Sequence, residues 1–80
     1  MSEDEVRELI IEIIADVAPE IDLSNTTGDE HLQKHYGLDS MDALTILEEI
    51  AEQTGVDIPE SDYEQTETLN GLSTYVAERT

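Results

Sequence analysis

The sequence contains no cysteine, tryptophan or phenylalanine, and it has only three basic residues. Without cysteine, the chain can form neither a disulfide framework nor a thiolate zinc site, and any thiol chemistry requires a group that the polypeptide does not supply. Without a basic patch or an aromatic platform, nucleic-acid binding has no support, and without a glycine-rich phosphate loop neither has nucleotide binding. Nucleotide binding, thiol catalysis and nucleic-acid binding therefore lack support in this sequence.

Negative charge dominates what is present. The chain carries 21 acidic side chains against Arg7, Lys34 and Arg79, which gives a formal net charge of -18 at pH 7. This self-repulsion opposes compaction and disfavours contact with nucleic acid or anionic lipid. We therefore expect partners with basic patches, and a melting temperature that rises when salt screens the carboxylates.

The length of 80 residues, with 38% hydrophobic content, predicts one small domain over residues 1–80. Such a domain has a single core and no room for a deep catalytic cleft. The acidic start, Met1 to Glu5, and the short apolar runs lack the features of a signal peptide or a membrane span. We expect a cytoplasmic protein that acts as a monomer.

The first element is predicted to be a helix over residues 3–18, because apolar side chains recur there at steps of three and four. Ser2 and Glu5 form a capping-box pattern at its start, and Pro19 ends it. The next segment, 19–39, is the only long connection, with a helical turn expected around 30–35. Apolar residues are spaced along it as if to pin it to the core: Ile21, Leu23, Leu32, Tyr36 and Leu38.

A second helix is predicted over residues 40–54, with one wide apolar arc, an acidic remainder and Gly55 as its C-terminal cap. A short third helix running through Tyr63 is expected to start at a second capping box, and Thr68 can cap a fourth helix. The residues of that second capping box are Ser61 and Glu64. No alternating strand pattern occurs. The expected fold is all-α, a four-helix bundle of three longer helices and one short helix, with a long loop between the first two.

Ser40, at the start of the second helix, admits more than one interpretation. Locally, either Ser40 or Asp39 is expected to cap the helix. A hydrolase triad with His35 is disfavoured, since residues adjacent in sequence rarely meet in triad geometry and a small bundle offers no sheltered oxyanion hole. His31 and His35, four residues apart, outline a possible metal site, whereas the simpler interpretation is two exposed loop histidines.

The residues Gly37-Leu38-Asp39-Ser40-Met41-Asp42 closely resemble the G-[LAG]-D-S-[LM]-[DE] signature of acyl carrier proteins. The resemblance covers most of the chain: an amphipathic first helix, a long loop, the signature serine at the second helix, then a short and a final helix. It implies that Ser40 receives a covalent 4'-phosphopantetheine group from coenzyme A, with Asp39 beside it. The arm would supply the missing thiol.

The resemblance also implies roles for other residues. Partners would be a phosphopantetheinyl transferase and acyl-loading or acyl-processing enzymes with basic docking patches. They would recognise residues of the second helix and its start: Asp39, Met41, Asp42, Leu44, Glu48, Glu49 and Glu52. Acyl chains would be sheltered by residues between the helices: Leu47, Ile50, Ile58, Tyr63, Thr66 and Leu72.

Tyr63 and Thr66 stand where family members usually place small or aliphatic side chains. A ring and a hydroxyl would shrink and wet the pocket. The expectation is a carrier that is not itself an enzyme, serving fatty acid or specialised lipid and secondary-metabolite biosynthesis, with short, polar or aminoacyl cargo favoured. The alternatives are a D-alanyl or peptidyl carrier, and an acidic interaction module without a prosthetic group.

Overall fold

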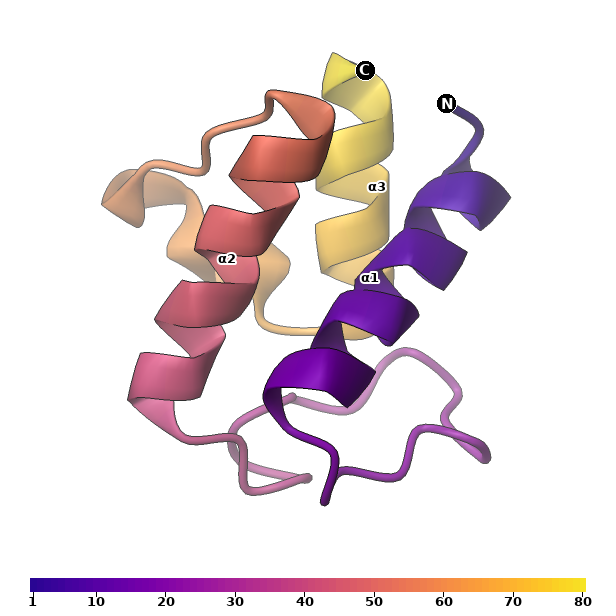
Figure 1. Cartoon of the computed structure of the whole chain (residues 1–80), viewed down its shortest axis with the longest axis vertical. Coiled ribbons are helices and arrows are strands. Elements are labelled where there is room, and N and C mark those ends of the chain that lie inside the picture. Colours follow the sequence, from indigo (N-terminus) through magenta and orange to yellow (C-terminus); the bar gives the residue numbers. More distant parts are fainter.

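The protein folds as a bundle of four helices without a strand, in a computed structural model that describes all 80 residues. Helix α1 packs against both α2 and α3, and the short 3-10 helix η1 packs against α3 (Figure 1). No helix is long and apolar enough to cross a membrane. The predicted all-α bundle is confirmed, with these elements: α1 (Glu3–Val17), α2 (Ser40–Thr54), η1 (Glu60–Thr66) and α3 (Leu69–Arg79).

Both ends of α1 follow the sequence prediction. The Glu5 amide donates to the Ser2 hydroxyl at 3.2 Å, and the Ser2 amide donates back to the Glu5 carboxylate at 3.3 Å. This reciprocal capping box satisfies two backbone donors that the helix leaves free. The helix ends before Pro19. Its apolar stripe supplies four buried residues to the core: Val6, Ile10, Ile13 and Ile14.

The long loop crosses one end of the bundle and returns to the start of α3 (Figure 1). The Asn70 amide donates to the Gly28 carbonyl at 2.9 Å, and the Leu32 amide donates to the Glu67 carbonyl at 2.9 Å. The His35 amide donates to the His31 carbonyl at 2.8 Å and closes a helical turn within the predicted 30–35 segment, and the Gly37 amide extends it by donating to the Gln33 carbonyl at 2.9 Å. All five predicted pinning residues are buried or pack against the core, so the loop is a fixed wall of the domain.

Helix α2 has the predicted bounds, and only part of its apolar arc is buried. Only Ile46 and Ile50 are fully buried, whereas Met41 is 75% exposed and Leu44 48% exposed. Gly55 closes the helix with a φ of 76°, a left-handed conformation that glycine adopts without steric cost. The apolar arc of α2 is therefore split between the core and the surface.

The start of η1 differs from the prediction. The helix begins at Glu60, and the residue before it, Pro59, makes no side-chain cap, so the predicted Ser61 and Glu64 capping box is wrong. The fixed φ of Pro59 instead starts a 3-10 turn, in which the Asp62 amide donates to the Pro59 carbonyl at 2.9 Å. Tyr75 of α3 donates its hydroxyl to Asp62 at 2.6 Å, which fastens η1 to α3 and raises the pKa of Tyr75.

Candidate functional site

Ser40 is the first residue of α2, and Asp39 rather than Ser40 caps this helix. The Asp39 carboxylate accepts the Met41 amide at 2.7 Å, while the Ser40 hydroxyl makes no hydrogen bond and is exposed. Gly37, with a φ of 74°, reverses the chain just before this point. The backbone amides of Ser40 and Asp42 have no partner either. A free hydroxyl thus stands beside two free donors at the positive end of a helix.

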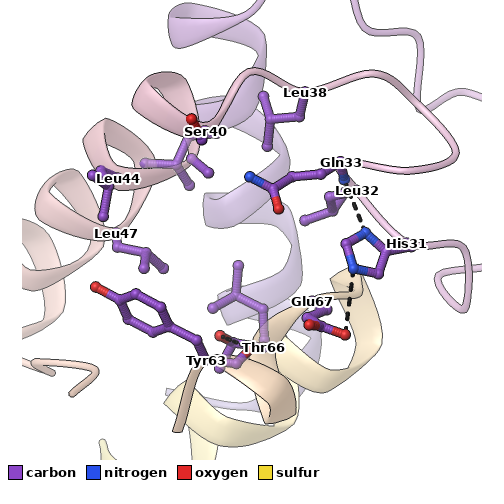
Figure 2. A pocket seen from close by; sticks show the side chains of 13 residues that line it. His31, Leu32, Gln33, Leu38, Ser40, Leu44, Leu47, Tyr63, Thr66 and Glu67 are labelled. Carbon is purple, nitrogen blue, oxygen red and sulfur yellow. Dashed lines mark hydrogen bonds and ion pairs between the residues drawn. The ribbon is translucent and has the colours of Figure 1, made fainter. Parts of the chain in front are cut away.

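A cavity of about 390 Å³ opens beside Ser40, between α2, η1 and the long loop (Figure 2). Its walls are mostly apolar, and Ser40 lies on its edge. Leu44 and Leu47 of α2 lie on the same side as Ser40, with Tyr63 of η1 below them. The full lining is His31, Leu32, Gln33, Leu38, Ser40, Ala43, Leu44, Ile46, Leu47, Tyr63, Thr66, Glu67 and Leu72.

Of the six predicted pocket residues, four surround this cavity: Leu47, Tyr63, Thr66 and Leu72. The other two do not line it. Ile50 lies in the core, farther along α2 from Ser40, and Ile58 packs half-buried against the core. The Thr66 hydroxyl donates to the Tyr63 carbonyl at 3.1 Å, so it is already satisfied within η1.

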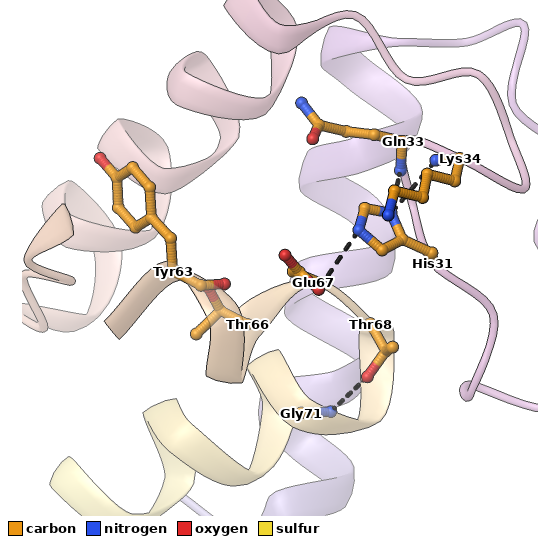
Figure 3. Close-up of polar contacts among 8 residues, drawn as sticks. All are labelled: His31, Gln33, Lys34, Tyr63, Thr66, Glu67, Thr68 and Gly71. Atoms are coloured by element: carbon orange, nitrogen blue, oxygen red, sulfur yellow. Dashed lines mark hydrogen bonds and ion pairs between the residues drawn. The ribbon is translucent and has the colours of Figure 1, made fainter. Parts of the chain in front are cut away.

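The polar end of the cavity was missed from the sequence. His31 accepts the amides of Gln33 and Lys34 on its Nδ1, at 3.2 and 3.1 Å (Figure 3). Its Nε2 lies 3.3 Å from the Glu67 carboxylate. Because Nδ1 accepts two hydrogen bonds, the neutral imidazole carries its proton on Nε2, the nitrogen that faces the Glu67 carboxylate. No local pattern could indicate this pair, since the two residues lie in distant segments that only the fold brings together.

The two histidines do not come together as metal ligands. His31 is engaged as described, and His35 instead packs edge-on against Tyr36, with ring centroids 4.8 Å apart. The structure contains no group of three or more histidine, aspartate and glutamate side chains that could hold a metal ion. The spacing of four residues therefore has a structural explanation, because His31 caps the turn that His35 belongs to.

The predicted docking residues all lie on α2 or at its cap, and none of them is buried. Met41 and Leu44 form an exposed apolar pair beside Ser40. Glu48 and Glu52 follow Leu44 at steps of four and so lie on the same face of the helix. Asp42 and Glu49 are half-buried and lie beside this face. One surface thus joins the free serine, two exposed apolar side chains and a row of carboxylates.

A protein-family model described as phosphopantetheine attachment site matches residues 8–76, which spans most of the chain and includes Ser40. The chain belongs to this family. Domains of this family carry covalently attached 4'-phosphopantetheine, so the protein is a phosphopantetheine carrier that meets a phosphopantetheinyl transferase and further enzymes. The resemblance to acyl carrier proteins is confirmed at the level of the family.

The residues present fit the phosphopantetheine group. Its attachment requires an accessible hydroxyl and room for an anion, and Ser40 offers an unpartnered hydroxyl next to the free amides of Ser40 and Asp42. When bound, the group supplies a terminal thiol, which this cysteine-free chain lacks. The family assignment and the local chemistry therefore agree.

Proposed function

We propose that Ser40 is the residue that receives the 4'-phosphopantetheine group, with Asp39 and Asp42 flanking it. The observation that carries this proposal is the division of roles at the start of α2: Asp39 caps the helix and leaves the Ser40 hydroxyl exposed and unpartnered. The other serines are less suited: Ser24 and Ser61 are exposed, but they lie in the long loop and in the 3-10 helix η1 and not at the start of an α-helix. Ser2 caps α1, and Ser73 is buried and bonded to the Leu69 carbonyl.

Attachment needs little rearrangement of this chain. The Ser40 Oγ would form the bond to phosphorus, its proton would pass to a base of the transferase, and the nucleotide portion of coenzyme A would leave. The resulting phosphodiester is an anion at a helix start, where free amides and the helix dipole favour negative charge. The modified state should therefore cost the fold little.

As a carrier, the protein would present acyl intermediates as thioesters to enzymes of fatty acid or specialised lipid and secondary-metabolite biosynthesis, without catalysing a reaction itself. The cavity beside Ser40 supports the proposal that part of the acyl cargo is buried in the protein. A D-alanyl or peptidyl carrier would have the same arm. Loading by a fatty-acid transacylase, as against an adenylating ligase, separates these two possibilities.

The surface around Ser40 supports a docking role. Met41 and Leu44 are exposed although they are large and apolar, and such side chains often mark contact sites. The neighbouring carboxylates complement basic grooves and would speed and orient encounters. We propose that a monomeric, cytoplasmic carrier uses this surface for the transferase and for acyl-processing enzymes in turn.

Intact mass spectrometry after co-expression with a promiscuous phosphopantetheinyl transferase tests the attachment. The wild type should gain the mass of the arm, Ser40→Ala should not, and Ser61→Ala, which alters an exposed serine on η1, should gain it normally. Glu48→Gln combined with Glu52→Gln should slow the transfer without changing its final extent. A wild type that never gains the arm, or a modified Ser40→Ala protein, would refute the proposal. An unmodified wild type would favour an acidic module that binds a basic partner without a prosthetic group, whereas a modified Ser40→Ala protein would assign the arm to another residue.

A further inference from the structure

The cavity beside Ser40 has an apolar side and a polar end. Attachment of the arm requires only the Ser40 hydroxyl and the free amides near it, so neither part of the cavity is needed for that step. Leu44 and Leu47 form the apolar side near Ser40, while His31, Gln33 and Glu67 form the other end (Figure 2). Cargo on an arm that starts at Ser40 can therefore meet apolar side chains and hydrogen-bonding groups in one space. The polar end is what could distinguish one cargo from another.

The hydrogen bonds at the polar end leave specific groups free. His31 has both nitrogens occupied, by the amides of Gln33 and Lys34 and by Glu67. The Glu67 side chain is 47% exposed, and only one of its two oxygens pairs with His31. The side-chain amide of Gln33 makes no hydrogen bond and extends into the cavity (Figure 2). The strongest free group is a carboxylate oxygen held in position by an imidazole, and it can only accept hydrogen bonds.

This arrangement distinguishes cargo groups by their charge and by their ability to donate hydrogen bonds. A purely alkyl chain would displace water from Glu67 and Gln33 without replacing its hydrogen bonds, which is unfavourable. A carboxylate cargo would meet Glu67 in a chain of net charge -18. A hydroxyl or an ammonium group would instead donate to Glu67. The volume, near the lower end of the range of about 300–1,000 Å³ for ligand pockets, favours a short chain.

We propose that the cavity selects a short acyl group that carries a hydrogen-bond donor, with Glu67 as the acceptor and His31 as the residue that positions it. This inference rests on the proposed attachment at Ser40 and adds the class of cargo. Hydroxyacyl and aminoacyl groups share the donor, and the experiment separates them.

The test uses the carrier loaded at Ser40 with butyryl, 3-hydroxybutyryl, 3-aminobutyryl or malonyl groups through the corresponding coenzyme A thioesters. Cleavage of each thioester by hydroxylamine is measured relative to the same thioester on free pantetheine. A hydrogen bond to a charged acceptor corresponds to roughly tenfold in a binding equilibrium. The 3-hydroxybutyryl and 3-aminobutyryl groups should therefore be protected up to about tenfold more than butyryl, and malonyl should be protected least.

Variants assign the effect to Glu67. Glu67→Leu should abolish the extra protection of both donor-bearing groups, whereas Glu67→Gln, which keeps an acceptor oxygen but removes the charge, should abolish it mainly for 3-aminobutyryl. Glu64→Leu, an exposed acid of η1 outside the cavity, is the matched control and should behave as the wild type. Shifts of the His31 imidazole and Gln33 amide NMR signals should accompany protection.

The possible failures are distinguishable. If no arm is attached, as seen by intact mass, the proposed function fails. If the arm and cargo are attached but all four groups are protected equally, or Glu67→Leu retains the preference, the cargo inference fails while the carrier assignment stands.

Discussion

Asp39 and Ser40 show how adjacent residues take different roles at the scale of single side chains. Both are suitable helix caps by type, and the sequence leaves the choice between them open. In the structure, Asp39 accepts the Met41 amide at 2.7 Å, and Ser40 is left exposed. A capping carboxylate therefore keeps the serine hydroxyl available for modification.

Glu30 lies in the long loop, next to His31. Its hydrogen bonds decide how the charge of its carboxylate affects the stability of this loop. The Thr26 hydroxyl donates to its carboxylate at 2.8 Å, and the Thr27 amide donates at 3.4 Å. These bonds, above all the one from Thr26, lower the pKa of Glu30 from 4.5 to about 2. Bonds to the ionised form stabilise the folded loop only while the carboxylate is charged.

This pKa shift predicts a pH dependence. Because the folded pKa lies below the ordinary value, the contribution of Glu30 to stability is complete above about pH 4.5 and is lost as the pH falls toward about 2. Glu30→Gln should therefore lower the free energy of unfolding at pH 6, and the difference from the wild type should vanish near pH 2. Urea denaturation across this range measures it. Glu20→Gln, at an exposed glutamate without hydrogen bonds, is the control, and a difference independent of pH for Glu30→Gln would contradict the prediction.

At the scale of elements, the junction between η1 and α3 decides where the lower wall of the cavity lies. Thr68 caps α3 as predicted, accepting the Gly71 amide at 3.0 Å (Figure 3). Gly71 also lies so close to the Gln65 carbonyl oxygen that a Cβ atom would overlap it. The absence of a side chain thus lets η1 turn tightly into α3.

Gly71→Ala is expected to destabilise the protein. Helix propensity alone predicts the opposite sign, because alanine is favoured over glycine by up to about 1 kcal/mol. Since the overlapped atom belongs to the backbone of η1, relief requires that the junction move, with a cost of about 1–3 kcal/mol. The urea midpoint measures this change. Glu78→Ala, at an exposed site of α3, should change stability by less than about 0.5 kcal/mol. A Gly71→Ala protein that is more stable than the wild type would contradict the prediction, because it would show that the junction between η1 and α3 can move at little cost.

At the scale of the whole molecule, almost all of the negative charge is unpaired. The only ion-pair geometry joins His31 to Glu67, and none of the three basic residues pairs with a carboxylate. Arg7 donates to Asn70, and Arg79 donates to the Tyr75 carbonyl at 3.0 Å and lies over the Tyr75 ring. The two arginines therefore stabilise the fold through neutral partners, and the carboxylates remain free to repel one another and to meet basic partners.

Screening should accordingly raise stability. Increasing sodium chloride from about 0.01 M to about 0.1 M shortens the Debye length from about 30 Å to about 10 Å, and the melting temperature should rise. Each 1 kcal/mol of relieved repulsion corresponds to about 4–8 °C for a domain of this size. Magnesium chloride at equal ionic strength should act at least as strongly. Thermal unfolding followed by circular dichroism measures this effect, and a melting temperature insensitive to both salts would contradict it.

Features encoded by neighbouring residues could be predicted from the sequence. The helical spacing of α1, its capping box and the cap by Thr68 all follow from contacts within a few residues, and the structure has them as predicted. The motif around Ser40 also indicated the family. The start of η1 was mispredicted because Ser61 has the right residue type for a cap, whereas Pro59 sets the local backbone.

The sequence by itself therefore determined the helical class, the carrier family and the exposed serine, because periodicity, capping and a short motif are local properties. Only the tertiary structure decided which side chains share the cavity. It placed Ile50 in the core rather than on the cavity wall, and it brought His31 of the loop to Glu67. The physical reason is that a cavity is formed by residues distant along the chain, and their proximity depends on how the loop and η1 pack on the helices.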